Sequence, residues 1–250
     1  PSNGGTGIGL STTLSWSSSS FADSYQYCYD IINDNQCNRT WSSPVVGTSV
    51  NISNLGANTT YYWQVRATNL AGTVEANNQV WNSFTTTSTL PAGSSAIETY
   101  VGVIKEGKYS LGSGQSLRES YTGVNNGPMK IISTNAIPLI GAERVVYKVK
   151  NVQTSFTEMM GLPDSQLTTI YWLPWYNNVD LDTQLRFGNV SGSTAHVHVY
   201  IGTDEMIGSP FTLQPGESTR QSFAGINNGP VKIQSDQNIV AAERVIYKVN

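Results

Sequence analysis

An internal duplication constrains this chain more than any single motif. Residues 100–149 and 200–249 are two copies of one unit, which begin with Tyr-Val-Gly and Tyr-Ile-Gly and end with Ala-Glu-Arg-Val-Val-Tyr-Lys-Val and Ala-Glu-Arg-Val-Ile-Tyr-Lys-Val. The centre of each copy holds Asn-Asn-Gly-Pro, at 125–128 and 227–230. Repeated units of this kind bury their apolar faces against neighbouring units. Because nothing reactive recurs in the two copies, the duplication favours a structural or adhesive protein over an enzyme.

Short alternating segments predict an all-β chain. Segments rich in Val, Ile, Thr, Tyr and Trp, such as 61–67 and 196–200, recur between clusters of Gly, Pro, Asn and Ser. No capped stretch shows the sustained period of 3.6 residues that a helix requires. The Thr- and Ser-rich segment 86–95 has the composition of a linker, and it lies where the first pattern stops and the duplicated unit begins.

The composition is typical of a secreted β-protein. Charged residues make up 12% of the chain, about half of the usual share of about 25%. The 14 Lys and Arg residues are scattered and the net charge is -3, so nucleic acid is not an expected partner. No apolar run approaches the roughly 20 residues that cross a bilayer. Because the sequence opens at Pro1 without an apolar leader, we expect any signal peptide or anchor to lie outside this sequence.

Residues 1–88 contain five strand-like segments in order. These are Leu14-Ser-Trp16, 23–30, 50–55, 60–67 and Trp81-Asn-Ser-Phe-Thr85. Together they resemble a fibronectin type III domain, which is an immunoglobulin-like sandwich. The stretch from Leu55 to Tyr61 resembles a tyrosine corner, in which the phenol bonds back to upstream backbone. The resemblance implies a binding or spacer module, although the Gly-rich residues 1–11 make a poor first strand.

The duplicated region is predicted to be a second β-sandwich region. The sequences at 171–178 and 208–219 resemble repeats found beside fibronectin-like domains in large secreted bacterial surface proteins. That resemblance implies an extracellular structural role. We therefore predict a fibronectin-like domain at 1–88, a linker at 89–95 and a duplicated β-sandwich region at 96–250. Within that region, copy one spans about 96–150 and copy two about 168–250.

Two features of the first domain concern cross-links. Cys28 and Cys37 are the two cysteines of the chain, and a disulfide between them is favoured over two free thiols in an oxidising compartment. Hard oxygen ligands of the kind that calcium takes follow the first cysteine; they are Asp30, Asn33, Asp34 and Asn35. An Asn- and Asp-rich turn more often closes a hairpin without metal, so the metal-free turn is the preferred interpretation, and no cofactor is predicted.

The densest aromatic patch comprises Tyr171, Trp172, Trp175 and Tyr176, followed by Asn and Asp residues. Aromatic planes beside amides and carboxylates suit sugar recognition, because a pyranose stacks on a ring while its hydroxyls accept and donate hydrogen bonds. The same residues build cores and subunit interfaces. We favour core or interface, and Pro174 indicates an edge strand or bulge.

Polar pairs recur in the two copies. Glu143 with Arg118, and Glu243 with Arg220, are predicted as structural ion pairs between strands, since adjacent residues of one strand face opposite ways and cannot pair. The Asn-Asn-Gly-Pro motif is predicted as a tight turn with positive φ at Gly or Asn.

The two histidines of the chain lie at alternate positions of one predicted strand. Because His196 and His198 would leave the same face, they could supply half of a zinc site. Surface or interstrand packing is the preferred interpretation, since no third ligand is obvious beyond Glu205.

No catalytic motif is present, so the chain is predicted not to be an enzyme. Copy two is preceded by 168–188, enough for two more strands, whereas copy one has no such segment. Either residues 92–250 form one pseudo-symmetric sandwich with shared strands, or a neighbouring molecule supplies a missing strand. The prediction is an extracellular, cell-surface structural protein that forms head-to-tail homopolymers. The alternative is a carbohydrate-binding or adhesive accessory module.

Overall fold

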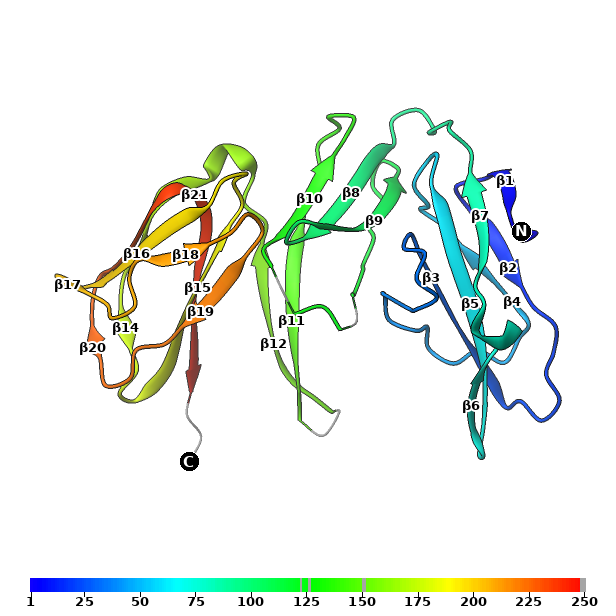
Figure 1. Cartoon of the computed structure of the whole chain (residues 1–250), viewed down its shortest axis with the longest axis horizontal. Helices are drawn as coiled ribbons and strands as arrows, with labels where there is room; N and C mark the ends of the chain where they lie inside the picture. Colours follow the sequence, from blue (N-terminus) through cyan, green and yellow to red (C-terminus); the bar gives the residue numbers. More distant parts are fainter. Residues whose placement is uncertain (122, 126, 150–151, 248–250) are drawn as a thin grey trace. The chain divides into compact units, whose positions relative to one another are not determined.

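The computed structural model is all-β, as the sequence predicts (Figure 1). It describes residues 1–121, 123–125, 127–149 and 152–247. These residues contain no α-helix; two short 3-10 helices, η1 (Asn77–Gln79) and η2 (Asp164–Gln166), interrupt the strands. No helix in the described part of the chain is long and apolar enough to span a membrane.

The chain forms two compact units. Unit 1 consists of Pro1–Tyr100, Lys105–Val124 and Ile131–Leu139, and unit 2 consists of Val101–Ile104, Asn125–Lys130 and Ile140–Asn250. The predicted linker 89–95 thus lies inside unit 1, and the sequence of copy one is divided between the two units.

Unit 1 is built on two sheets from the first 86 residues. A five-stranded sheet has the order β1-β7-β5-β3, with β6 also paired to β5, and β2 pairs with β4. Their bounds are β1 Gly5–Ile8, β2 Thr12–Ser15, β3 Ser24–Asp30, β4 Ser49–Ile52, β5 Thr60–Asn69, β6 Gly72–Glu75 and β7 Asn82–Thr86. The Gly-rich front of the chain forms the short strand β1, which runs parallel to β7.

The first core follows from alternation along β5. Tyr61, Trp63 and Val65 are each at most 5% exposed and pack with Leu14 and Phe84. The predicted bond from the phenol to upstream backbone is present, because Gly56 N–H donates to Tyr61 Oη over 2.8 Å.

The same tyrosine corner contacts the first residues of the duplicated region, which belong to unit 1. Tyr61 Oη donates to the carbonyl of Lys108 over 2.6 Å. A Cβ on Gly56 would lie 2.6 Å from the Cβ of Lys108, so this close approach requires glycine. Arg39 also forms an ion pair with Glu119. These contacts explain why unit 1 extends past the predicted domain boundary.

The duplicated region forms the remaining strands. A three-stranded sheet has the order β10-β8-β9, β11 pairs with β12, and β14 pairs with β20. The seven-stranded sheet of unit 2 has the order β17-β16-β21-β15-β19, with β13 on β21 and β18 on β16. The bounds are β8 Ser95–Val101, β9 Ile104–Leu111, β10 Met129–Ser133, β11 Ala142–Val149, β12 Val152–Met160, β13 Thr168–Leu173, β14 Tyr176–Asn177, β15 Leu181–Asn189, β16 Ala195–Ile201, β17 Asp204–Glu205, β18 Phe211–Leu213, β19 Ser218–Gln221, β20 Asn227–Asn228 and β21 Val231–Tyr247.

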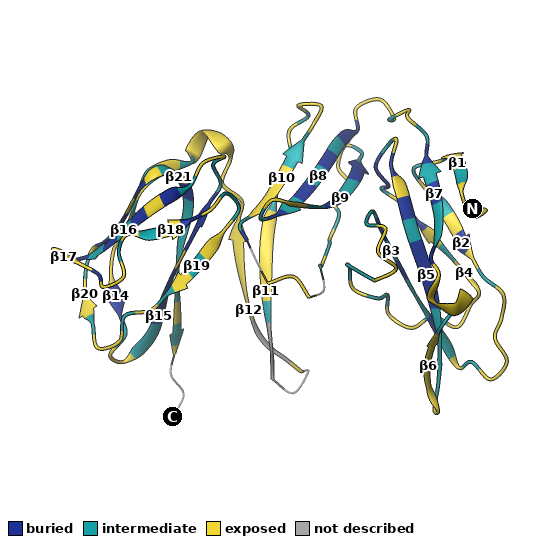
Figure 2. Ribbon diagram, viewed as in Figure 1, coloured by how far each residue is buried: buried dark blue, intermediate teal, exposed yellow. Residues whose placement is uncertain are grey.

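One face of β16 packs into the core of unit 2. Ala195, Val197, Val199 and Ile201 are each at most 1% exposed and alternate with more exposed residues, so one face of the strand packs and the other faces solvent. Figure 2 shows this change of burial along β16. The segment 168–189 supplies β13, β14 and β15, one strand more than predicted.

Each copy forms an equivalent backbone hydrogen bond to the proline of its Asn-Asn-Gly-Pro motif. Gly102 N–H donates to the carbonyl of Pro128 over 3.0 Å, and Gly202 N–H donates to that of Pro230 over 2.9 Å. The predicted positive φ within the motif is wrong for copy two: it occurs upstream at Gly225 (78°), and Asn227–Asn228 forms β20. Glycine is needed at Gly229 because a Cβ there would lie 2.9 Å from the Cα of Trp175.

Candidate functional site

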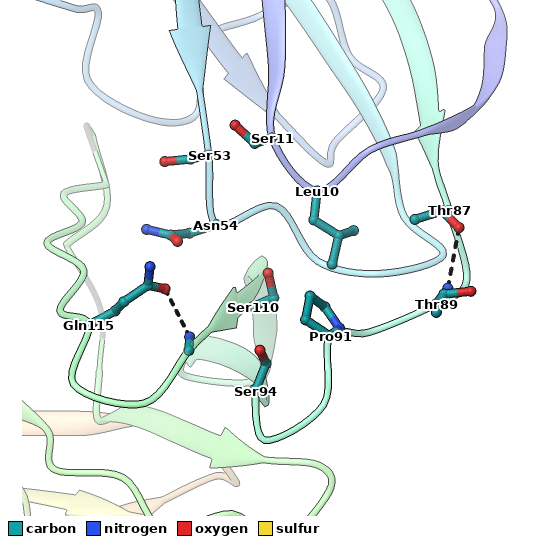
Figure 3. A pocket seen from close by; sticks show the side chains of 11 residues that line it. Leu10, Ser11, Ser53, Asn54, Thr87, Thr89, Pro91, Ser94, Ser110 and Gln115 are labelled. Atoms are coloured by element: carbon teal, nitrogen blue, oxygen red, sulfur yellow. Dashed lines mark hydrogen bonds between the residues drawn. The ribbon is translucent and has the colours of Figure 1, made fainter.

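The larger cavity lies in unit 1 and carries no titratable side chain. It measures about 600 Å³ and is drawn in Figure 3. It is lined by Leu10, Ser11, Ser53, Asn54, Thr87, Thr89, Pro91, Ser94, Ser110, Gly112 and Gln115. The amide of Gln115 is engaged locally, since its Oε1 accepts a hydrogen bond from Gly112 N–H over 2.9 Å. Hydroxyl and amide groups can bind a polar ligand, but this lining supplies no general acid or base.

The aromatic run of β13 and β14 is divided between core and surface. Tyr176 is fully buried, and Tyr171 packs against the same core. In contrast, Trp172 is 62% exposed and Trp175 is 42% exposed, with its indole N–H donating to Asn227 Oδ1 over 3.2 Å. The run thus contributes both to the core and to a surface on which a ring plane is accessible.

Trp172 belongs to a row of outward-facing side chains across four strands. It lies opposite Lys232 of β21, which lies opposite Tyr200 of β16, which in turn lies opposite Glu205 of β17. The Nζ of Lys232 stands 4.2 Å from the centroid of the Tyr200 ring. With neighbouring strands about 4.8 Å apart, the two aromatic rings flank one cation on an open sheet face. We call these four residues the aromatic row.

The histidines extend this face with two separate carboxylate pairs. His196 Nδ1 lies 2.7 Å from Asp236 Oδ2, and His198 Nδ1 lies 2.6 Å from Glu205 Oε1. The backbone and ring of His196 both hydrogen-bond Asp236 and hold the pKa of that carboxyl below its usual value. Both rings leave the same face, as predicted. No group of three or more His, Cys, Asp or Glu suited to a metal ion occurs among the described residues.

The cysteines form the predicted disulfide, which joins Cys28 of β3 to Cys37. The oxygens proposed as calcium ligands accept hydrogen bonds inside unit 1. Asp30 accepts from the amides of Ile32 and Asn38, and Asp34 Oδ1 accepts from that of Gln36.

Asn35 of the same loop has a φ of 56°, and its Oδ1 accepts from the amide of Trp81. No hydrogen bond of the Asn33 side chain is among these contacts. These are Asx-type bonds, which are common in Asn- and Asp-rich turns, and calcium binding by this loop stays a prediction.

One of the two predicted ion pairs is wrong. Arg220 lies opposite Arg186 of β15, whereas Glu243 lies opposite Leu185, the neighbouring residue of the same strand. Since adjacent residues face opposite ways, Glu243 and Arg220 lie on different faces of the sheet. The Oε1 of Glu243 is buried without a hydrogen-bond partner among the described residues, and burial raises the pKa of this carboxyl.

The pair predicted in copy one remains a prediction, because Glu143 and Arg118 belong to different units. The adjacent residue of β11, Arg144, pairs with Glu158 of β12 at 2.7 Å between Nη2 and Oε2.

Three members of the aromatic row are not marked as a common site by the sequence, in which Glu205 suggested only a possible third zinc ligand. Tyr200, Lys232 and Glu205 lie in different segments, and each resembles an ordinary exposed strand residue. Lys232 lies opposite Tyr200 from more than 30 positions away, so this neighbour depends on strand pairing that no local pattern reveals.

Comparisons with known proteins do not identify a family. No family model matches the sequence, and no curated protein matches it. Among solved structures, an α-L-rhamnosidase from Dictyoglumus thermophilum aligns with a TM-score of 0.30 and 11% identity, over 98% of this chain and 26% of the enzyme. The chain spans about a quarter of the length of that enzyme, and a TM-score of this size carries no argument about fold or function.

Proposed function

We propose that this chain is a non-enzymatic, extracellular structural protein of a bacterial surface that assembles through open β-edges. The observation that carries the proposal is the exposed hairpin of β11 and β12. These two strands form a sheet of their own. A two-stranded ribbon is marginally stable alone, and open strand edges pair readily with further strands.

The counterpart of β11 in copy two indicates which kind of strand can pair with this sequence. The sequence at 142–149 differs from that at 242–249 by one residue, Val146 in place of Ile246. In copy two the equivalent part of β21 pairs with β15 from Leu181 to Asn189. Copy one has no sequence equivalent to β15, and β11 pairs with β12 instead.

The hairpin exposes apolar side chains on both of its faces, which packing against a partner would cover. Those more than 40% exposed are Val145, Val152, Phe156, Met159 and Met160. The occupant that we propose is a second copy of this chain, because the chain itself carries strands of complementary pattern in its duplicated region. A fibronectin type III identity for residues 1–88 is supported by the bond of Tyr61 to Gly56, and an extracellular location by the disulfide.

We expect the purified chain to associate with rising concentration. Val145→Lys and Phe156→Lys place charges on the exposed hairpin, so each should shift the midpoint of association to at least tenfold higher concentration. Light scattering after gel filtration and electron microscopy measure the association and show whether the polymers are regular filaments. Leu70→Lys, at a fully exposed position of the β5–β6 hairpin, is the matched control. A wild-type chain that stays monomeric at all concentrations would refute the proposal.

Carbohydrate binding is a second candidate function, favoured by the aromatic row. Trp172 and Tyr200 offer ring faces for stacking, and Lys232 and Glu205 offer hydrogen bonds to hydroxyls. Ring faces beside polar groups on an exposed sheet face are the arrangement that a sugar-binding site requires. It corresponds to the accessory-module alternative, and it is compatible with an assembling protein.

We expect Trp172→Ala to weaken glycan binding by roughly fivefold, because stacking on one ring contributes on the order of 1 kcal/mol. The fold should be retained, because the indole is mostly exposed. A glycan array followed by titration calorimetry on the best ligand measures the affinity. Phe21→Ala, which removes an 89% exposed ring of unit 1, is the control. Equal affinity for the wild type and the Trp172 variant would exclude the aromatic row as the site.

A further inference from the structure

Two arginines face each other directly across the β15–β19 pair. Arg186 lies opposite Arg220 in the register, and Ser218 lies opposite Gly188 one step along the same face. Residues opposite each other in an antiparallel pair have Cβ atoms about 5 Å apart, and like charges in this position are destabilising. Both arginines are exposed, so water screens part of this repulsion, and a bound anion would relieve the rest.

No described residue supplies a compensating negative charge. Neither guanidinium forms an ion pair or a hydrogen bond within the described part of the chain. Glu243 faces the opposite side of the sheet. The carboxylate on the same face of β15, Asp182, accepts a hydrogen bond from Gln184 over 2.9 Å.

The arginines line a polar cavity of unit 2. It measures about 290 Å³ and is lined by Asn125, Arg186, Ser218, Thr219 and Arg220. No carboxylate lines it. Arg186, Arg220 and Ser218 share one face of the β15–β19 pair, whereas the Thr219 side chain faces the other side and accepts a hydrogen bond from Gln221. The side chains that face the cavity therefore offer two cations, one hydroxyl and one amide. Each of these groups can donate a hydrogen bond to an anionic oxygen.

The segment around Pro128 packs closely against β15 and β19 beside this cavity, and two glycines permit that packing. The segment around Pro128 crosses the sheet face so closely that a Cβ on Gly188 would lie 3.1 Å from the Cδ of Pro128. A Cβ on Gly127 would lie 3.3 Å from the hydroxyl of Ser218. The absence of two side chains therefore lets this segment lie over the strands, with Asn125 at the cavity beside the arginines.

We propose that this cavity binds a tetrahedral oxyanion, the phosphate or sulfate ester group of a larger ligand. Paired guanidinium groups give planar, bidentate hydrogen bonds to such oxygens, and the bound charge removes the repulsion between Arg186 and Arg220. The site takes its arginines from copy two and Asn125 from copy one. Copy one has a counterpart of Arg220 in Arg118 but no sequence equivalent to β15, so the arginine pair of this site has no counterpart there. The site is independent of the aromatic row and of the exposed hairpin.

Binding is tested on the full chain with inorganic sulfate, inorganic phosphate, dextran sulfate and neutral dextran. At constant ionic strength, we expect calorimetry and the melting temperature to report binding of sulfate or phosphate and no binding of neutral dextran. Arg186→Gln and Arg220→Gln should each weaken it at least tenfold. Tighter binding of dextran sulfate than of free sulfate identifies a polymeric sulfate ester, and preference for phosphate identifies a phosphate ester.

Arg118→Gln is the matched control, since it removes the same charge from the equivalent position of copy one. It should leave the affinity unchanged. Without added anion, Arg186→Gln and Arg220→Gln should melt at or above the temperature of the wild type, because the like-charge contact is gone. The proposal is overturned by a wild type that binds none of the anions, or by an equal loss of affinity in all three variants.

Discussion

Replacing Tyr176 by alanine should lower the free energy of unfolding of unit 2 by about 3 to 5 kcal/mol, the range for removing a fully buried aromatic ring. The side chain is completely inaccessible and packs in the core of unit 2 with Leu185 and Phe223. Its ring lies 6.2 Å from that of Phe223 between centroids. Loss of this ring leaves a cavity that strands from three parts of the chain cannot close.

The hydroxyl of Tyr176 has a separate effect that Tyr176→Phe isolates. It donates to the carbonyl of Thr183 over 3.1 Å and accepts from the amide of Phe223 over 2.6 Å. Removing it leaves the amide of Phe223 without its acceptor, whereas the carbonyl of Thr183 still accepts from Ser222 Oγ over 3.0 Å. We expect a loss of about 1 to 3 kcal/mol.

Hydrogen exchange of β16 amides and calorimetry measure both Tyr176 losses. Trp172→Phe, at an exposed position of the preceding strand, should change stability by less than about 0.5 kcal/mol. Comparable losses for Tyr176→Phe and Trp172→Phe would contradict the division of the aromatic run into core and surface.

The stability of unit 1 should fall as pH rises from 4 to 6 because of Asp30. Burial raises the pKa of this carboxyl from its ordinary value of 3.8 to about 6, although the amides of Asn38 and Ile32 partly oppose the shift. Between those two values the folded chain holds a proton that the unfolded chain has released. The unfolding free energy therefore decreases with rising pH across this window and becomes constant with respect to Asp30 above it.

A difference of about two pH units corresponds to about 2 to 3 kcal/mol. Urea unfolding of the wild type and of Asp30→Asn at pH 4, 5, 6 and 7 measures it. Residue 30 of the variant is neutral at every pH. The difference in unfolding free energy between the two proteins should therefore change by that amount, because the wild type becomes less stable relative to the variant as pH rises. Asp23→Asn controls for general charge removal, because this exposed carboxylate of unit 1 is not among the groups that shift the pKa of Asp30. A wild type that gains stability relative to Asp30→Asn between pH 4 and 6 would show that the ionised form is favoured on folding.

Local pattern was sufficient for the features that depend on neighbouring residues. Alternation along 61–67 and 196–200 predicted strands, and placed His196 and His198 on one face, because side chains of a strand alternate between faces whatever it pairs with. The bond between Tyr61 and the backbone of Gly56 and the disulfide between Cys28 and Cys37 span five and nine positions. A local turn brings such partners together, so the sequence predicts them well.

Partners across long separations could not be predicted in the same way. Glu243 and Arg244 were correctly expected to lie on opposite faces, because they are adjacent in one strand. Which of the two shares a face with Arg220 depends on how β15 is aligned with β19 and with β21. A shift of that register by one residue would exchange the faces. The position of Leu185 in the core fixes the register, and Arg220 then lies opposite Arg186.

The sequence by itself determined that this chain is all-β, that it is duplicated, and that a disulfide closes one of its loops, because each of these follows from period, identity or short spacing. The tertiary structure alone decided that Tyr176 is buried while Trp172 lies in a row with Lys232 and Tyr200, and that two arginines share a cavity. Those outcomes depend on which strands pair and in which register. Core packing over the whole unit sets that choice, and no local stretch of sequence carries it.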